Sequence, residues 1–268
     1  MRRLLLIGIG AGDPEFVTQQ AIRALNEVDV FFVMEKGEDR DELVALRREI
    51  CARYIEGESY RILAVRDPQR DRAAAAYAAA VDDWRRARSE LWERLICGEL
   101  DENGVGAILV WGDPSLYDST LTIVDAIRAG GRLAFEVEVI PGVSAIAALC
   151  ARHGIALNRV GEPVLVTTGR RLAHDGWPAA VPDVVVMLDA RCAFREVADP
   201  AEVDIYWGAY LGTPDELLIA GPVAQVGAEI ERVRAAARER KGWIMDTYLL
   251  RRRPGPARIV AVEAPRDD

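Results

Sequence analysis

WGDPSLYDST, at residues 111–120, marks a boundary between two sequence patterns. An apolar run over 107–111 stops at Gly-Asp-Pro (112–114), and a helical pattern resumes at Ser119. A strand that ends in this way brings bare backbone, a carboxylate and a rigid turn to the carboxyl edge of a sheet. Because open α/β folds bind ligands at that edge, the segment predicts an α/β fold with a ligand site at 112–114.

Two further loops also follow predicted strands, GIGAGDP at 8–14 and PGVSAIAA at 141–148. Strand-like and helix-like segments alternate through the first half, and the apolar run at 4–9 is typical of a strand buried on both faces. We expect strands at 4–9, 29–33, 60–65, 107–111 and 133–140, and helices after Thr18, at 41–54, at 72–96 and from Ser119. This alternation predicts a mostly parallel sheet.

The second half changes character near 161–163, where the apolar runs become short and closely spaced. We expect strands at 164–168, 184–188, 205–210, 217–220, 243–250 and 258–262, with one amphipathic helix at 222–240. Short strands in quick succession predict a mixed sheet. The expected fold class is therefore α/β with two domains, an N-terminal one at 1–160 and a C-terminal one at 161–268.

The composition argues against several classes of function. With 34 basic and 43 acidic side chains, the formal net charge of −9 disfavours an extended nucleic-acid-binding surface. The 4 cysteines are widely separated and no secretory signal is evident, which predicts reduced thiols in a cytoplasmic protein. The short apolar run after Arg3 predicts a strand and no membrane span. Neither His153 nor His174 belongs to a ligand cluster, so we expect no metal site.

The first glycine loop also suggests a dinucleotide-binding loop of an NAD-dependent oxidoreductase. That fingerprint requires two residues between its second and third glycines, whereas one residue separates Gly10 from Gly12. Asp13 and Pro14 then place a negative charge and a ring where pyrophosphate needs free amides. A nicotinamide or flavin cofactor is therefore a minor alternative for this loop. A further alternative is a tight turn between strand and helix that binds no ligand.

Taken together, the three loops resemble those of the tetrapyrrole (corrin/porphyrin) methyltransferases, which use S-adenosylmethionine. The resemblance covers essentially the whole chain and includes LVTTGRR at 165–171 and TPDE at 213–216. VFFVMEKG, LRREIC and YWGAYLGTPDE are most similar to members that methylate carbon 1 of precorrin-5 and expel the acetyl group there. The resemblance implies a cofactor in the cleft between two α/β domains, a tetrapyrrole substrate, S-adenosylhomocysteine as product and a homodimer.

The family's cofactor contacts can be carried onto matching positions of this chain. The residues that the resemblance implies are Gly10, Ala11, Trp111, Gly112, Asp113, Leu116, Ser144, Ala145, Met187, Gly221 and Pro222. Many relatives have proline where this chain has Ala11. S-adenosylmethionine carries a sulfonium and no phosphate, which suits a site with the Asp113 carboxylate and few arginines. A helix cap for Asp113 and plain core packing for Met187 remain open.

Methyl transfer needs alignment more than acid–base chemistry, so the lack of a catalytic triad does not exclude an enzyme. Deacetylation is different, because a base assists the attack of water on a carbonyl group. The candidate catalytic residues are Tyr117, Asp118 and Glu35. The alternative role for Tyr117 is to pack its ring beneath the loop. For His153 we expect helix capping.

Basic residues that could bind the carboxylates of a tetrapyrrole gather around predicted strand ends. They are Lys36, Arg66, Arg70 and Arg72. Because Asp67 and Asp71 interleave with them, a merely solvated charged surface is the alternative. Three alternatives to a tetrapyrrole methyltransferase remain: a same-fold enzyme acting on a macromolecule, an NAD oxidoreductase, and a non-catalytic sensor of an adenosyl ligand.

Overall fold

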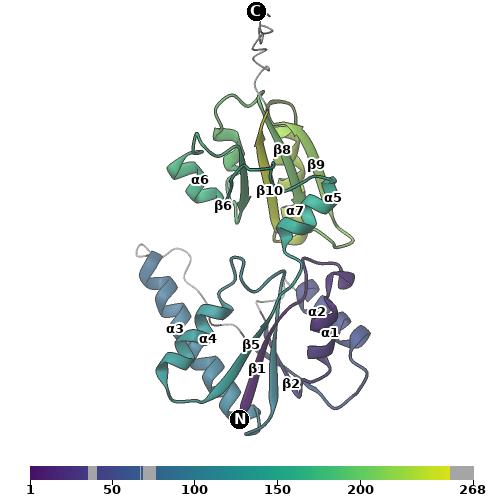
Figure 1. Cartoon of the computed structure of the whole chain (residues 1–268), viewed down its shortest axis with the longest axis vertical. Coiled ribbons are helices and arrows are strands. Elements are labelled where there is room, and N and C mark those ends of the chain that lie inside the picture. The colour runs from purple at the N-terminus through teal and green to yellow at the C-terminus, as the bar shows by residue number, and fades with distance from the viewer. Residues whose placement is uncertain (36–40, 67, 69–76, 254–268) are drawn as a thin grey trace, which may run out of the picture.

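The computed structural model describes residues 1–35, 41–66, 68 and 77–253. Two α/β domains lie one above the other along the longest axis of the molecule (Figure 1). Each domain is built around one five-stranded sheet, with strand orders β3-β2-β4-β1-β5 and β6-β7-β10-β8-β9. The predicted α/β fold class is confirmed, with a parallel sheet in the first half and a mixed one in the second.

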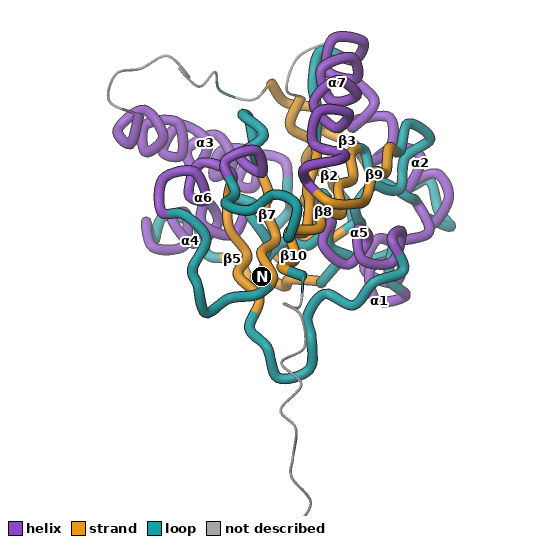
Figure 2. The backbone as a smooth tube through the Cα atoms, turned by 90° about the horizontal axis from the view of Figure 1, so that it is seen from above, coloured by secondary structure: helices purple, strands orange, loops and turns teal. Residues whose placement is uncertain are grey.

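The N-terminal sheet is parallel throughout, so the carboxyl ends of its strands share one edge. Its strands are β1 (Arg2–Gly8), β2 (Val30–Glu35), β3 (Arg61–Arg66), β4 (Val105–Val110) and β5 (Phe135–Ile140). Helices α1 (Gln19–Leu25) and α2 (Asp41–Tyr54) cover one face, and α3 (Tyr77–Glu99) and α4 (Thr120–Gly130) cover the other (Figure 2). Leu5 packs toward α1 and α2 and Leu4 toward α3 and α4, as the two-residue period of a doubly buried strand requires.

The C-terminal sheet mixes both strand directions. Its strands are β6 (Val164–Thr168), β7 (Asp183–Met187), β8 (Val203–Ala209), β9 (Leu217–Pro222) and β10 (Asp246–Arg252). Only β6 and β7 are parallel neighbours, and the other pairs are antiparallel. The long helix α7 (Val223–Lys241) matches the expected one, whereas the short α6 (Gly169–Asp175) was not expected. The strand expected at 258–262 lies outside the described residues.

Helix α5 (Ala145–His153) follows the last strand of the N-terminal sheet but packs against β8 and β10 of the C-terminal sheet (Figure 1). The chain therefore reaches the second sheet before residue 160, the expected domain division. In the described ranges, no helix combines the length and the apolar character needed to cross a membrane.

A glycine contact and an arginine bridge join the two domains. A Cβ atom at Gly12 would overlap the carbonyl oxygen of Leu211, in the turn after β8, so a side chain at residue 12 would separate the two loops. Arg152 of α5 then connects both sides: its Nε donates to Oε2 of Glu216 at 3.0 Å, and its Nη2 lies 3.5 Å from Oδ2 of Asp13. We call Asp13, Arg152 and Glu216 the interdomain bridge.

The three loops singled out in the sequence meet at the carboxyl edge of the parallel sheet. The Gly10 N–H donates to the Gly112 carbonyl at 3.2 Å, and the Gly112 N–H donates to the Gly10 carbonyl at 2.8 Å. The third loop packs so closely that a Cβ atom at Gly142 would overlap the Gly112 carbonyl oxygen and lie 2.8 Å from the Gly8 carbonyl carbon. The loops therefore contact one another backbone to backbone.

This packing predicts that Gly142→Ala destabilises the protein. The new methyl group cannot be accommodated without moving two strands' ends, so we expect a loss of about 2–3 kcal/mol in the free energy of unfolding, measured by urea denaturation. Gly98→Ala is the matched control, because Gly98 lies in α3 with open space around it and alanine should add about 0.5–1 kcal/mol. Equal stabilities of Gly142→Ala and the unsubstituted protein would contradict the close approach.

Candidate functional site

Asp113 ties the second loop to the third. Its Oδ1 accepts hydrogen bonds from the N–H of Ser115, at 2.9 Å, and from the Ser115 hydroxyl, and its Oδ2 accepts from the N–H of Gly142 at 3.0 Å. Burial raises the pKa of Asp113, but these hydrogen bonds outweigh it and hold the pKa below its ordinary value. The carboxylate is therefore charged at neutral pH and fixes the relative position of two loops.

Beside this contact, the second loop presents bare backbone and an unused donor. Gly112 has a φ of +72°, and the nearest atom to a Cβ placed there would be the Ala145 nitrogen at 4.0 Å. The Trp111 Nε1 is buried and has no hydrogen-bond partner within the described part of the chain. A ligand that approaches the backbone closely and offers hydrogen-bond acceptors fits this surface, as the predicted S-adenosylmethionine does.

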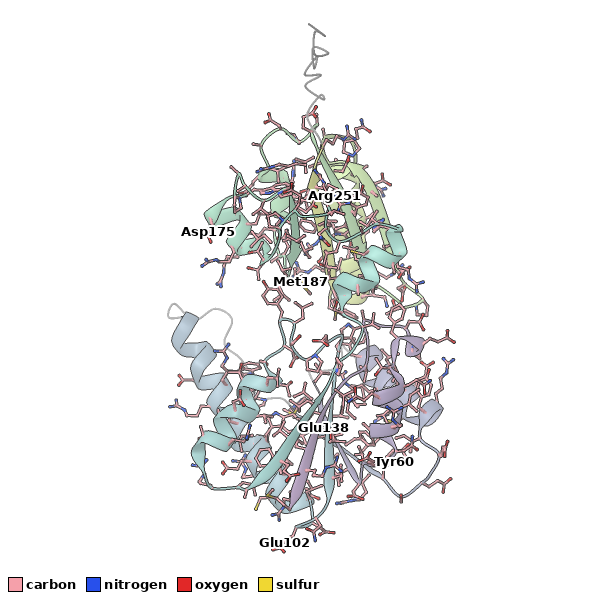
Figure 3. The ribbon with its side chains drawn as sticks, in the orientation of Figure 1. Tyr60, Glu102, Glu138, Asp175, Met187 and Arg251 are labelled. Carbon is pink, nitrogen blue, oxygen red and sulfur yellow. The ribbon has the colours of Figure 1, made fainter. Side chains whose placement is uncertain are left out.

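The remaining predicted cofactor residues divide into two groups. Ala11, Leu116, Ala145 and Met187 share one apolar cluster across the domain boundary, next to Ser144, whose Oγ accepts from the N–H of Ala147 and caps α5. Figure 3 shows Met187 at the edge of the C-terminal domain that faces the N-terminal domain.

The structure does not bring Gly221 and Pro222 to the other loops. Strand pairing places Gly221 opposite Ile205 on β8, which is level with Val184, three residues before Met187. β9 is also three strands away from β7, which separates them by about 15 Å at the usual strand spacing.

An exposed apolar surface lies on both sides of the domain boundary. The side chains of Tyr117, Val166 and Leu188 are 45%, 36% and 65% exposed. The Tyr117 hydroxyl donates to the Val166 carbonyl at 3.4 Å, so the phenol reaches from the second loop to β6. Exposed apolar side chains at a domain boundary are candidates for a binding surface. We call these three residues the apolar cleft surface.

Leu188 is held in place by the residue that follows it. Leu188 has a φ of +52°, which is unusual for a branched side chain. The buried Asp189 carboxylate accepts from the N–H of Ala193 at 2.6 Å and from the Tyr248 hydroxyl at 2.7 Å. The Asp189 carbonyl accepts from Arg234 at 2.6 Å. This buried network fixes the turn that presents Leu188.

Two of the three catalytic candidates have a described environment. Tyr117 belongs to the apolar cleft surface, and the Asp118 carboxylate accepts from the N–H of Thr120, the first residue of α4, at 2.7 Å. Glu35 ends β2, and its side chain lies outside the described residues. His153 is in the last turn of α5, where its Nε2 lies 3.0 Å from the Trp207 carbonyl oxygen, an environment that is structural.

Only one of the four predicted substrate-binding cations can be placed. Arg66 is exposed at the carboxyl end of β3, and Lys36, Arg70 and Arg72 lie outside the described residues. The sequence reasoning missed Arg47 of α2, whose guanidinium reaches the carboxyl end of β4. Val166, in the middle of β6, and Leu188, just after β7, were not expected either, because an apolar strand pattern does not reveal which of its side chains stay exposed.

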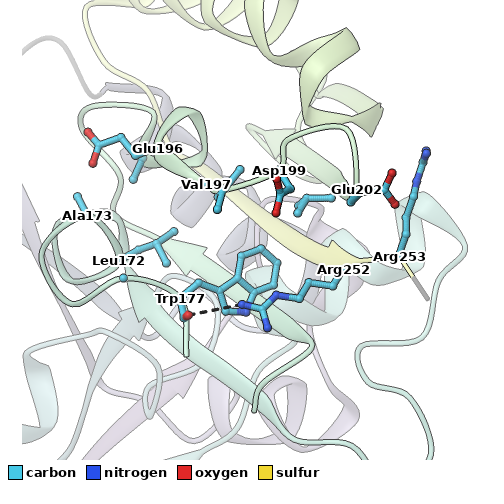
Figure 4. A pocket seen from close by; sticks show the side chains of 13 residues that line it. Leu172, Ala173, Trp177, Glu196, Val197, Asp199, Glu202, Arg252 and Arg253 are labelled. Atoms are coloured by element: carbon cyan, nitrogen blue, oxygen red, sulfur yellow. Dashed lines mark hydrogen bonds between the residues drawn. The ribbon is translucent and has the colours of Figure 1, made fainter. Parts of the chain in front are cut away.

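A partly open pocket of about 470 Å³ lies elsewhere, at the end of the C-terminal domain where β10 finishes (Figure 4). Trp177, Val197, Val203 and Arg252 are among its lining residues. Because Arg252 and Met187 mark opposite ends of the antiparallel pair β10–β7, this cavity is separate from the three loops. The loops, with their unpaired donor and bare backbone, remain the candidate site.

Comparisons with known proteins agree with this geometry. The family model for tetrapyrrole (corrin/porphyrin) methylases matches residues 3–227. The chain is 52% identical over 252 residues to the precorrin-6A synthase [deacetylating] of Sinorhizobium sp, which covers 94% of this chain and 96% of that protein.

Solved structures show the same architecture. A putative cobalamin synthesis related protein (CobF) from Corynebacterium diphtheriae has a TM-score of 0.82 and 39% identity, covering 95% of this chain and 100% of that one. Uroporphyrin-III C-methyl transferase from Thermus thermophilus, complexed with S-adenyl homocysteine, shares the fold with a TM-score of 0.54 and 22% identity, covering 92% and 96%. The family match runs from β1 into α7, well over half of the chain, and this chain belongs to the tetrapyrrole (corrin/porphyrin) methylase family.

Proposed function

We propose that this chain is an S-adenosylmethionine-dependent C-methyltransferase of corrin biosynthesis, acting on carbon 1 of precorrin-5. The acetyl group leaves as acetate and the product is precorrin-6A. The observation that carries this proposal is the 52% identity to a precorrin-6A synthase [deacetylating] over almost the full length of both proteins. The backbone contact of the three loops supports it, because the loops meet at the carboxyl edge of a parallel sheet, where open α/β folds bind small ligands.

S-adenosylmethionine supplies an electrophilic methyl group on a sulfonium and leaves as S-adenosylhomocysteine. In our proposal, Gly10, Ala11 and Gly112 let it approach the backbone, and the Trp111 Nε1 donates a hydrogen bond to it. Gly10 cannot also hold a phosphate through its amide, since that N–H already donates to Gly112. This arrangement disfavours the dinucleotide alternative.

On the acceptor side, the apolar cleft surface supports binding of a macrocycle. Tyr117, Val166 and Leu188 offer apolar area, and the Tyr117 hydroxyl has only a long hydrogen bond to a carbonyl. We assign to that hydroxyl a proton-transfer role when water adds to the acetyl carbonyl carbon and the bond to the ring carbon breaks. Asp118 and Glu35 remain the other proposed catalytic residues.

We also propose a homodimer working in the cytoplasm. Cys51, Cys97, Cys150 and Cys192 are all free thiols, which suits a reducing compartment. Light scattering of the purified protein measures the oligomeric state directly.

The decisive experiment incubates the purified protein with precorrin-5 and methyl-labelled S-adenosylmethionine. We expect one labelled methyl group in the tetrapyrrole, detected by mass spectrometry. We also expect one equivalent of released acetate, measured in the same reaction mixture. Binding of S-adenosylhomocysteine without any methylated product would leave a sensor of adenosyl ligands. A methylated product with the acetyl group retained would place the reaction at another ring position.

Asp113→Asn should weaken the binding of S-adenosylhomocysteine about tenfold in calorimetry. An asparagine side chain has one acceptor oxygen, and its NH₂ group would face a backbone N–H. It therefore loses the hydrogen bond to either Ser115 or Gly142, at a cost of about 1.4 kcal/mol. Asp125→Asn on the exposed face of α4 is the control and should bind normally. Unchanged affinity of Asp113→Asn would show that the loop contact does not form the cofactor site.

Tyr117→Phe should lower the rate of acetate release at least about tenfold, because the variant lacks only the proton-transferring group. The dissociation constant of S-adenosylhomocysteine should stay the same, since the ring and its packing are retained. Stopped-flow measurement of acetate release and calorimetry check the two expectations separately. A full rate of release from this variant would reduce Tyr117 to a packing role.

A further inference from the structure

Arg47 has an unusual environment for a cation. It lies in the middle of α2, half-buried, and its Nε donates to the Leu109 carbonyl at 3.2 Å. One of its terminal nitrogens donates to the Leu43 carbonyl, one turn earlier, at 2.8 Å. Leu109 is the penultimate residue of β4, directly before the segment that begins at Trp111. The guanidinium group therefore lies near the carboxyl end of β4, on the face of the sheet that α2 covers.

The side chain points toward the domain boundary. Side chains on a helix lean toward its N-terminus, and the hydrogen bond to Leu43 shows Arg47 doing so. Leu43 itself packs against the core cluster of the C-terminal domain, although α2 belongs to the N-terminal one. The guanidinium is thus close to the place where α2, the end of β4 and the C-terminal domain meet.

Among the side chains that the structure describes, Arg47 has no carboxylate in direct contact. Within the described ranges, no carboxylate oxygen lies within 4.0 Å of its nitrogens, and Asp118 acts on it only through a longer-range attraction. Burial lowers the pKa of Arg47, and the charge of Asp118 partly offsets that effect. Other arginines of the same domain do have partners, such as Arg53 with Glu15 and Arg132 with Glu93. Two carbonyl groups use only part of the five N–H donors of Arg47.

We propose that Arg47 is a substrate-binding residue, whose guanidinium pairs with one carboxylate of the polycarboxylate tetrapyrrole at the domain boundary. The identity of the ligand rests on the proposed function, whereas the need of the cation for an anion rests on its surroundings. A planar guanidinium pairs with a carboxylate through two parallel hydrogen bonds, and the low dielectric of a half-buried site strengthens that pair. In a protein of net charge −9, such a local cation offsets the general repulsion of a polyanion.

A purely structural role would have different consequences. If Arg47 only joins α2 to β4, its replacement should lower stability and leave the affinity for the tetrapyrrole unchanged. Arg47→Lys separates the two roles, because an ammonium group can still donate to the Leu109 carbonyl but cannot make the bidentate pair.

The test compares Arg47→Lys, Arg47→Gln and the control Arg48→Gln, which changes the exposed neighbouring residue on the same helix. We expect the KM for precorrin-5 to rise about tenfold in Arg47→Lys and further in Arg47→Gln, as loss of a charge-assisted pair predicts. The kcat at saturation, the affinity for S-adenosylhomocysteine and all constants of Arg48→Gln should not change. Raising the salt concentration should weaken substrate binding less in Arg47→Gln than in the unsubstituted protein.

A second probe keeps this inference separate from the proposed function. Uroporphyrin, a polycarboxylate porphyrin, is titrated against the same proteins and followed by quenching of tryptophan fluorescence. If the unsubstituted protein binds uroporphyrin without methylating precorrin-5, the proposed function is wrong, and the titration of the Arg47 variants still decides the role of this residue. An unchanged KM together with unchanged uroporphyrin affinity in Arg47→Gln overturns the inference. If the unsubstituted protein neither methylates precorrin-5 nor binds uroporphyrin, both proposals are overturned.

Discussion

Backbone contact between three loops is the constraint on which the rest of this structure depends. The glycines at 10, 112 and 142 come from distant parts of the chain and meet without side chains between them. The single carboxylate of Asp113 then holds two of these loops by hydrogen bonds to both of its oxygens. A surface made from backbone carries few rotatable groups, so it loses little conformational entropy when a small ligand binds. The parallel sheet below provides a rigid base, because its strands are buried on both faces.

The C-terminal domain contributes surface rather than charge to the site. Val166 of β6 and Leu188 after β7 are exposed apolar residues of this domain, and the Tyr117 hydroxyl of the other domain reaches the Val166 carbonyl. The buried Asp189 network fixes the turn after β7, so the unusual conformation of Leu188 is maintained by hydrogen bonds some distance from the surface.

Local signals in the sequence were enough to predict the alternation of elements, the helix at 41–54 and the three loops. Gly-Asp-Pro and Pro-Gly-Val-Ser indicate strand ends within a few residues, because turn residues act locally and do not depend on the rest of the fold. The connection from Asp113 to Gly142 was beyond reach, because it depends on β1 lying between β4 and β5. The place of Gly221 likewise depends on strand order in a mixed sheet. Arg47 was overlooked because an arginine in an amphipathic helix normally indicates a solvated face, and only the tertiary fold brings it to the end of β4.

The interdomain bridge has a consequence for how such proteins can exchange parts during evolution. Asp13 follows β1, Arg152 lies in α5 after the last strand of the first sheet, and Glu216 lies late in the second half. If two relatives recombine at a point between residues 152 and 216, Asp13 and Arg152 come from one parent and Glu216 from the other. Gly12 must also meet a compatible backbone at Leu211, because there is no space for a side chain to adapt. An exchange of whole domains between relatives therefore requires matched partners on both sides of the boundary, at Gly12 and Leu211 and in the interdomain bridge.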